Sequence, residues 1–200
     1  QYPEVIADVL KLKNCVIDGE IVAWGKDILP FSELQRRLGR KKVTQKILDE
    51  IPIKFLAFDC LEFEGIDIRR ESYEVRRKKL QDLLDLTRLD RLEIAPKIEA
   101  LDWNDLIEAR AKSRSRKVEG VMIKSKSSPY LTGRKKGYWW KWKVDPLTVD
   151  AVMIYAQAGS GRRASLFTDY TFAVWDDEKQ KQTLLPIAKA YSGLTHTEIE

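Results

Sequence analysis

Apolar residues in this chain occur mostly in short runs, which predict strands more readily than long helices. Residues 14–24 and 53–63 are rich in β-branched and aromatic residues and predict two long strands. The first strand is expected to break at Asp18-Gly19, and Glu64-Gly65 is expected to form the turn after the second. Further strands are predicted at residues 118–124, 138–144, 148–155 and 168–175.

Three helices are also predicted before residue 118. A short amphipathic helix is expected at residues 32–38, and a longer one at residues 72–86 begins with a serine suited to the N-cap. Asp102 is predicted to cap a third helix. Leu101 and Leu106 stand at the two positions of a hydrophobic staple, so we expect them to pack against each other.

The mixed order of strands and helices predicts an α+β domain followed by a β-rich one. Pro146 is the best boundary between the two, because the pattern of residues changes there. We therefore expect one domain over residues 1–146 and a second over residues 147–200.

Positive charge is concentrated in one part of the chain. Twelve lysines and arginines but only one acid, Glu119, lie between Arg110 and Val144, which gives this basic stretch a net charge of +11 against +5 for the whole chain. Such a stretch indicates a polyanionic partner, either nucleic acid or nucleotide phosphates. A solvated helix face is the alternative for residues 110–117, but it does not explain the cations that alternate with tryptophans further on.

Other features narrow the class of protein. No apolar run approaches the roughly 20 residues that span a bilayer, and the first residues do not resemble a signal peptide. Cys15 and Cys60 lie in apolar stretches without metal-ligand spacing, which favours buried thiols in a reducing compartment. We therefore expect a cytoplasmic protein with no membrane partner.

Lys141 and Lys143 are the first candidates for phosphate binding. On a strand they project from the same face, roughly 7 Å apart, with Trp140 and Trp142 on the other face. Two lysines on a rigid strand can contact one phosphate from two directions. An edge strand that uses lysines against aggregation is the alternative, but the neighbouring tryptophans favour a binding function.

Three acidic or aromatic positions have a binding and a structural interpretation each. Glu119 should stay ionised among cations, and it could ligate Mg²⁺ beside a phosphate or form an ion pair with a neighbouring base. Asp18-Gly19-Glu20 places two carboxylates on one strand face, and the glycine between them would let a ligand approach the backbone. The alternative is that the three residues form a turn. Phe58 could stack on an adenine ring, but its position in an apolar strand favours the core.

The order of these segments resembles that of the covalent nucleotidyltransferases and, more narrowly, of bacterial ATP-dependent DNA ligases. The resemblance rests on four blocks: Asp18-Gly19-Glu20, Phe58-Asp59, Glu119-Gly120-Val121-Met122-Ile123-Lys124 and Trp140-Lys141-Trp142-Lys143. Residues 145–200 are similar to the opening of an OB-fold domain in such ligases. The resemblance implies a partial nucleotidyltransferase domain with antiparallel sheets and flanking helices, followed by the start of a β-barrel OB-fold domain.

The resemblance also implies roles for single residues. Phe58 would stack on adenine, Glu20 would hold the ribose and help with the metal, and Glu119 would bind Mg²⁺. Lys141 and Lys143 would contact the α-phosphate of ATP and stabilise its transition state. The implied partners of the whole enzyme are ATP, Mg²⁺ and nicked double-stranded DNA, bound by a monomer.

Two positions depart from the family pattern. The family nucleophile is a lysine in Lys-x-Asp-Gly, but Asp-Gly occurs here only at 18–19 and Val16 takes the lysine position. The resemblance places the nucleophile before Gln1 and the final basic motif beyond Glu200, so we expect this chain alone to be inactive. Members of the family usually carry an arginine a few residues before the lysine that corresponds to Lys141. Here Arg134 and Lys135 are both candidates for that position.

A helix start close to Glu200 fits the expectation that this chain is part of a longer protein. Thr195-His196-Thr197-Glu198 has the pattern of a capping box, which predicts a helix from residue 196. Two other functions stay open. A related RNA ligase or guanylyltransferase would share the same blocks, and a non-catalytic nucleic-acid-binding module would explain the missing nucleophile.

Overall fold

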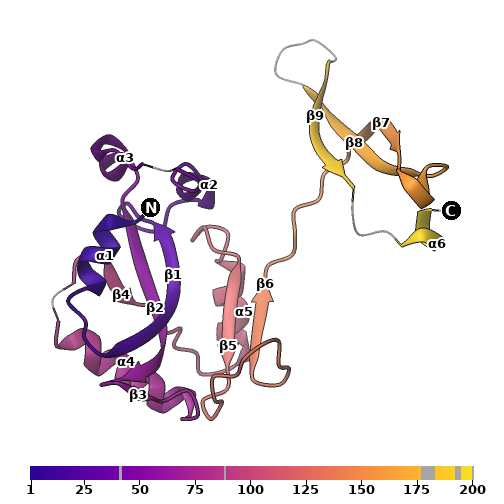
Figure 1. The fold of residues 1–200 in the computed structure, drawn as a ribbon. Coiled ribbons are helices and arrows are strands. Elements are labelled where there is room, and N and C mark those ends of the chain that lie inside the picture. Colours follow the sequence, from indigo (N-terminus) through magenta and orange to yellow (C-terminus); the bar gives the residue numbers. More distant parts are fainter. Residues whose placement is uncertain (41, 88, 177–182, 192–194, 200) are drawn as a thin grey trace. The chain divides into compact units, whose positions relative to one another are not determined.

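The structure is a computed structural model that describes residues 1–40, 42–87, 89–176, 183–191 and 195–199 (Figure 1). The chain divides into two units, Gln1–Asp145 and Pro146–Glu200. The first unit contains every residue for which the sequence predicts a role, so its two sheets position the candidate site. No helix within the described residues is long and apolar enough to cross a membrane.

The larger sheet of the first unit is built on one long central strand. It contains four strands: β1 (Cys15–Ala23), β2 (Ile53–Phe63), β3 (Ile66–Asp67) and β4 (Leu92–Ile94). β2 pairs antiparallel with β1 and β3 and parallel with β4. Both long strands lie where the sequence predicts them. Glu64 and Gly65 form the predicted turn, since both have the positive φ angles of a tight hairpin, 53° and 80°.

The predicted break in β1 is a shift in strand register between Asp18 and Gly19. A Cβ atom at Gly19 would lie 2.6 Å from the backbone oxygen of Leu56 and 2.5 Å from a ring carbon of Phe55. Only glycine fits such an approach without a shift of the neighbouring strand. The register of the strand that carries Glu20 therefore depends on this glycine.

Four helices accompany this sheet within the described residues (Figure 1): α1 (Pro3–Val9), α2 (Phe31–Gln35), α3 (Gln45–Glu50) and α4 (Tyr73–Asp85). The prediction for α4 is confirmed, and Ser72 caps it by accepting a hydrogen bond from the Val75 N–H at 3.3 Å. α2 is shorter than predicted. α1 and α3 were not predicted, because each spans fewer than two turns and α3 buries no residue.

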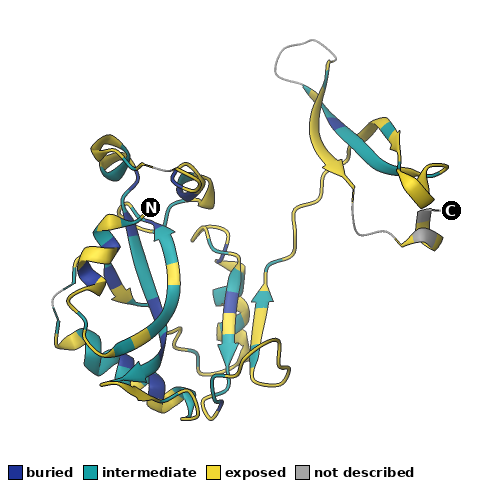
Figure 2. Ribbon diagram, in the orientation of Figure 1, coloured by how far each residue is buried: buried dark blue, intermediate teal, exposed yellow. Residues whose placement is uncertain are grey.

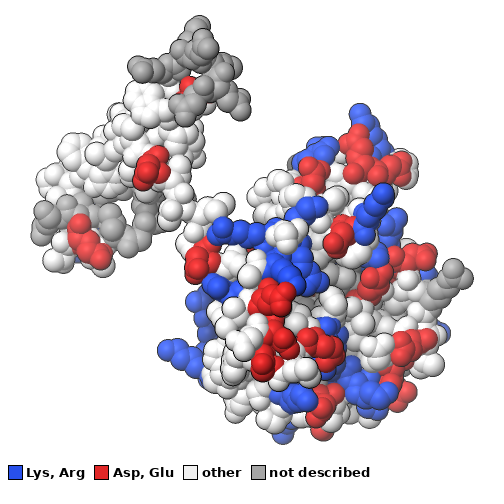
Figure 3. Space-filling view, turned by 180° about the vertical axis from the view of Figure 1, so that it is seen from behind, with Lys and Arg blue, Asp and Glu red and all other residues white. Residues whose placement is uncertain are grey.

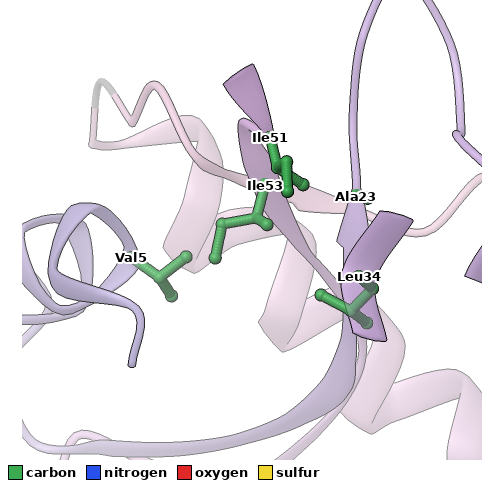
Figure 4. Close-up of a cluster of buried hydrophobic side chains, with 5 residues drawn as sticks. All are labelled: Val5, Ala23, Leu34, Ile51 and Ile53. Atoms are coloured by element: carbon green, nitrogen blue, oxygen red, sulfur yellow. The ribbon is translucent and has the colours of Figure 1, made fainter. Parts of the chain in front are cut away.

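Two apolar clusters pack against the larger sheet, and Figure 2 shows buried positions along β2. The first cluster lies between α1, α2, the C-terminal end of β1 and the N-terminal end of β2 (Figure 4). It consists of Val5, Ala23, Leu34, Ile51 and Ile53. The second lies between α4 and the sheet, and consists of Ala57, Cys60, Leu80 and Leu92. Both clusters use β2, so its position is fixed along most of its length.

The second sheet of the first unit is a hairpin with a helix packed on it. β5 (Gly120–Lys124) pairs antiparallel with β6 (Trp139–Lys143), and α5 (Trp103–Ala111) contacts β5. Both strands and the helix agree with the prediction. Asp102 caps α5 as expected, because its carboxylate accepts hydrogen bonds from the N–H groups of Asn104 and Asp105 at 2.8 and 3.1 Å.

The predicted hydrophobic staple before α5 is wrong. The Leu101 side chain is 100% exposed, so it does not pack on Leu106. The backbone N–H of Leu101 instead donates to the carboxylate of Asp105 at 2.7 Å. This polar contact fixes the entry of the chain into the helix and takes the place of the apolar one.

The second unit is a three-stranded antiparallel sheet in the order β7 (Val152–Ala158), β8 (Phe167–Asp176), β9 (Thr183–Ala190). A short 3₁₀ helix, η1 (Gly161–Arg163), separates β7 from β8. β9 was not predicted, and Pro186 explains why, since proline within a run weakens the strand signal. α6 (His196–Ile199) begins at the predicted capping box, where the Thr195 N–H donates to the Glu198 carboxylate at 2.8 Å.

All strand pairs but the parallel β2–β4 pair are antiparallel, and helices flank the sheets, which confirms the predicted fold class. The identity of residues 147–200 as an OB-fold domain stays a prediction, and so do the two domain assignments.

Candidate functional site

The β5–β6 hairpin positions the two candidate lysines. Its register pairs Gly120 with Lys143, Met122 with Lys141 and Lys124 with Trp139. Lys141 and Lys143 are both exposed and lie at alternate positions of β6, so the strand directs them to one face. Trp142 lies at the intervening position, where its ring meets Trp103 of α5 at 6.2 Å between centroids.

Glu119 is paired with one of these lysines. Its carboxylate lies 2.5 Å from the Lys143 Nζ, and both side chains are exposed. The hydrogen bond from Lys143 lowers the pKa of Glu119, and the charges of Lys143 and Lys141 lower it further. The sequence allowed either an ion pair or a metal site at Glu119, and the ion pair is present. A carboxylate held in its ionised form beside two lysines remains suited to a cation and a phosphate together.

Gly120, which follows Glu119, is required by the close pairing of the hairpin. Its φ is 148°, and a Cβ atom there would lie 2.6 Å from the Cα of Lys143 and closer still to the backbone oxygen of Trp142. An alanine would push the two strands apart. The Glu-Gly dipeptide thus places the carboxylate where the partner strand carries Lys143.

Phe58 faces a buried ammonium group and does not belong to either apolar cluster. The Nζ of Lys124 lies 4.3 Å from the centroid of the Phe58 ring, and it also lies over the rings of Trp139 at 4.0 Å and Tyr73 at 4.7 Å. Phe58 itself is half-buried. The core interpretation that the sequence favoured is thus only partly right, because the ring lies between the sheet and the hairpin.

The ammonium group of Lys124 is enclosed by aromatic rings. Its Nζ is buried and has no hydrogen-bond partner among the residues that the structure describes. Burial lowers the pKa of Lys124 to about 8, although the charges of Asp59 and Asp18 act in the opposite direction. The three ring faces attract the cation and offset part of the cost of removing it from water.

We expect Lys124→Met to stabilise the protein at neutral pH by about 1–2 kcal/mol, after allowance for residual solvent screening. Between pH 8 and the ordinary pKa of 10.5, the unfolded chain keeps a proton that the folded chain has lost, so wild-type stability rises with pH across this window. The advantage of the variant should therefore disappear near pH 10.5. Urea unfolding from pH 7 to 10.5 measures it.

Lys126→Met is the control for this prediction, because Lys126 is 75% exposed and lies two residues away. Its stability difference from the wild type should not change over the same pH range. A Lys124→Met variant that is less stable than the wild type at pH 7 would show that the three rings more than compensate for the buried charge.

Asp18 and Glu20 have different surroundings. Asp18 accepts a hydrogen bond from the Tyr130 hydroxyl at 2.8 Å, and burial together with this bond raises the pKa of Tyr130 to about 12. Glu20 is exposed, and it lies beyond the register shift, opposite Leu56. Asp18 is therefore a structural link to the loop after β5, whereas Glu20 presents an exposed carboxylate.

Arg134 and Lys135 both lie in the loop between β5 and β6 and both are exposed. Lys135 lines a pocket of about 220 Å³ whose other walls are Pro129, Tyr130, Leu131, Gly133, Tyr138 and Trp139. Arg134 does not line this pocket. The choice between Arg134 and Lys135 as the counterpart of the family arginine stays a prediction.

The basic stretch is partly used for internal contacts. Arg110 donates to the backbone oxygen of Lys143 at 2.8 Å and contacts the Asp145 carboxylate at 3.2 Å, and Arg114 donates to the backbone oxygen of Asp145. Figure 3 shows lysine and arginine side chains gathered on part of one face of the first unit, with acidic side chains between them. Fewer cations are thus available to a polyanion than the net charge suggests.

Sequence reasoning missed the buried polar contacts behind this site. Asp59 and Arg76 are both fully buried and form an ion pair, in which the Arg76 Nε lies 2.7 Å from the Asp59 Oδ1. One signal was present in the sequence: Arg76 lies one helical turn before Leu80, on the apolar side of α4. A cation at such a position needs a buried partner.

Comparison with known proteins assigns the class. Antiparallel sheets with flanking helices match the nucleotidyltransferase domains of DNA ligases. A mycobacterial DNA ligase D complexed with ATP and MES is 25% identical and has a TM-score of 0.55, over 99% of this chain and 57% of that one. Pmar-Lig_Pre has a TM-score of 0.70 over 100% of this chain and 46% of its own, but at 18% identity it shows the fold alone.

The family follows from the sequence comparisons. The model of the ATP dependent DNA ligase domain matches residues 1–143, so the chain belongs to this family. A probable DNA ligase of Opitutus terrae is 35% identical over an alignment 228 positions long, which covers 100% of this chain and 22% of that protein. A probable DNA ligase of Koribacter versatilis is 34% identical, over 99% and 38%. The chain thus spans well under half the length of these relatives.

Proposed function

We propose that this chain forms the nucleotide-binding part of an ATP-dependent DNA ligase that seals nicks through lysyl-AMP and DNA-adenylate intermediates. The contact of Lys124 with both Phe58 and Trp139 carries the proposal. Phe58 comes from β2, whereas Trp139 opens the strand of the two candidate phosphate lysines. The ring that we propose for base stacking and the strand that we propose for phosphate binding thus share one neighbour, Lys124, which supports a nucleotide site.

In this proposal each polar group meets one part of ATP. Phe58 stacks on adenine and Glu20 meets the ribose. Lys141 and Lys143 contact the α-phosphate, where they stabilise the charge that builds up during transfer. Lys135 takes the role of the family arginine, because it lines the neighbouring pocket.

Magnesium fits the site as a partner of ATP. The described residues contain no group of three or more candidate ligands, so the protein alone offers no cage for a metal ion. Mg²⁺ is commonly held by one or two carboxylates together with phosphate oxygens and water. Glu119, with help from Glu20, would hold it in that way. The ion would neutralise phosphate charge during transfer.

The covalent steps need a group that the chain lacks. In the ligase reaction a lysine attacks the α-phosphate of ATP, forming a P–N bond and releasing pyrophosphate. AMP then passes to the 5′-phosphate of the nick, and the 3′-hydroxyl displaces AMP. Since Val16 stands two residues before Asp18-Gly19, this chain has no lysine in Lys-x-Asp-Gly. We propose that the chain alone binds ATP without forming an AMP adduct and seals no nicks.

Nicked DNA is the proposed second partner. The exposed cations of the basic stretch would neutralise its phosphates, so binding should weaken as salt rises. We place the whole enzyme in the cytoplasm as a monomer. The unpaired thiols of Cys15 and Cys60 support a reducing compartment.

Titration of the chain with ATP and Mg²⁺ by calorimetry tests the proposal. We expect Phe58→Ala and Lys141→Met each to weaken ATP binding about tenfold, through the loss of base stacking and of a charged phosphate contact. Phe31→Ala and Lys46→Met are the controls, since Phe31 is 62% exposed on α2 and Lys46 81% exposed on α3. Binding of DNA without any binding of ATP would favour the non-catalytic module instead.

A further inference from the structure

Arg76 of α4 makes a bidentate contact with the strand that carries Phe58. Its Nε and Nη2 donate to the two carboxylate oxygens of Asp59, at 2.7 and 3.0 Å. Both side chains are fully buried. A planar guanidinium in such a fork fixes both distance and orientation, which a lysine cannot do.

The remaining nitrogen of Arg76 reaches the hairpin. Its Nη1 donates to the backbone oxygen of Ser128 at 2.9 Å and to that of Glu71 at 2.6 Å. The Ser128 hydroxyl in turn accepts a hydrogen bond from the Trp139 Nε1 at 3.0 Å. A continuous polar path thus runs from Asp59 in β2 through Arg76 and Ser128 to the first residue of β6.

Aromatic rings complete the surroundings of Arg76. The rings of Tyr73 and Tyr130 both lie 5.8 Å from the guanidinium carbon, and Tyr130 donates its hydroxyl hydrogen to Asp18. Three of the four sequence blocks therefore meet around one side chain: Asp18 of the first, Asp59 of the second and the strand of Lys141 and Lys143 in the fourth.

We propose that Arg76 is a positioning residue that fixes the distance between the base-stacking Phe58 and the phosphate-binding Lys141 and Lys143. Arg76 itself contacts neither base nor phosphate. The proposal rests on the nucleotide-binding function proposed above. It assigns the base to β2 and the phosphate to the β5–β6 hairpin, which are the two elements that Arg76 joins. A change at Arg76 should thus reduce the contribution of the phosphate to binding while the base is still bound.

Arg76→Lys and a matched control, Arg37→Lys, test the proposal. Arg37 is also fully buried, and it contacts the Glu4 carboxylate and the backbone oxygens of Ile51 and Gln1. Both variants lose a buried guanidinium fork, but only Arg76 joins β2 to the hairpin. The probes are AMP and adenosine, titrated separately at a temperature where circular dichroism shows both variants to be folded.

We expect wild-type protein to bind AMP more tightly than adenosine. In Arg76→Lys, AMP affinity should fall about tenfold while adenosine affinity changes less than about twofold. In Arg37→Lys the ratio of the two affinities should equal that of the wild type. An unchanged ratio in Arg76→Lys, or an equal loss of both ligands, would overturn the proposal, because general loosening of the fold affects both ligands alike.

Hydrogen exchange separates failure of this proposal from failure of the proposed function. In Arg76→Lys, backbone amides of the hairpin should exchange at least about tenfold faster than in wild type, while the β1–β2 pairing keeps its rates. If wild-type protein binds neither AMP nor adenosine, the nucleotide function fails, and the exchange rates still decide whether Arg76 holds the hairpin on β2. Unchanged hairpin rates would reject that role as well.

Discussion

Asp59→Ala is expected to lower the free energy of unfolding by about 3–5 kcal/mol, the cost of breaking a buried ion pair from one side. The variant leaves the guanidinium of Arg76 inside the protein without its carboxylate partner, and both side chains have no exposed surface in the folded chain. Urea unfolding followed by circular dichroism measures the loss. We expect the urea concentration at the midpoint of unfolding to fall. The slope of the free energy of unfolding against urea concentration should stay the same.

Asp67→Ala is the matched control for this variant. Asp67 also pairs with an arginine, Arg69, at 2.7 Å, but the two side chains are about half exposed. An exposed pair contributes little to stability in water, so the control should be nearly neutral. Equal stability losses in the two variants would contradict the buried pair. Asp59→Leu combined with Arg76→Met should recover much of the loss, since paired apolar replacement removes the unpaired charge.

Gly120→Ala is the second substitution with a large expected effect, a loss of about 3–5 kcal/mol from backbone strain and steric overlap together. The positive φ of 148° disfavours any side chain, and the added methyl group would overlap the backbone of Trp142 and Lys143. The strands of the hairpin must then separate. Urea unfolding measures the loss, and hydrogen exchange should show it first in β5 and β6.

Gly133→Ala isolates the strain from the overlap. Gly133 has a φ of 73°, but no described atom lies within 4 Å of the position that an added Cβ would occupy. Its replacement should lower the free energy of unfolding by about 1–2 kcal/mol, the cost of a left-handed backbone conformation for a residue with a side chain. If both glycine variants lose the same amount, close approach of the two strands is not what requires Gly120.

Much of the fold follows from local pattern. The runs at 14–24 and 53–63 predicted β1 and β2 within a residue or so, because β-branched and aromatic residues favour extended backbone and turn residues mark the ends of the runs. Short elements escaped prediction. α3 has six residues and buries none of them, so its sequence carries no periodic signal.

The candidate site was predictable only in part. Alternation along β6 placed Lys141 and Lys143 together, and the same local reasoning allowed an ion pair at Glu119. The contact of Lys124 with Phe58 and the position of Arg76 depend on pairings between distant segments. Arg76 and Ser128 are 52 positions apart, and no local pattern specifies which carbonyl a buried guanidinium meets.

ATP binding by the unmodified chain is the measurement that tests the central claim most directly. The chain would be titrated in the presence of Mg²⁺ with ATP and, separately, with GTP, and its intact mass recorded afterwards. We predict saturable binding of ATP, binding of GTP at least about tenfold weaker, and no gain in mass. Absence of ATP binding would contradict a nucleotide pocket built from Glu20, Phe58 and the hairpin, and a preference for GTP would contradict an ATP-dependent enzyme.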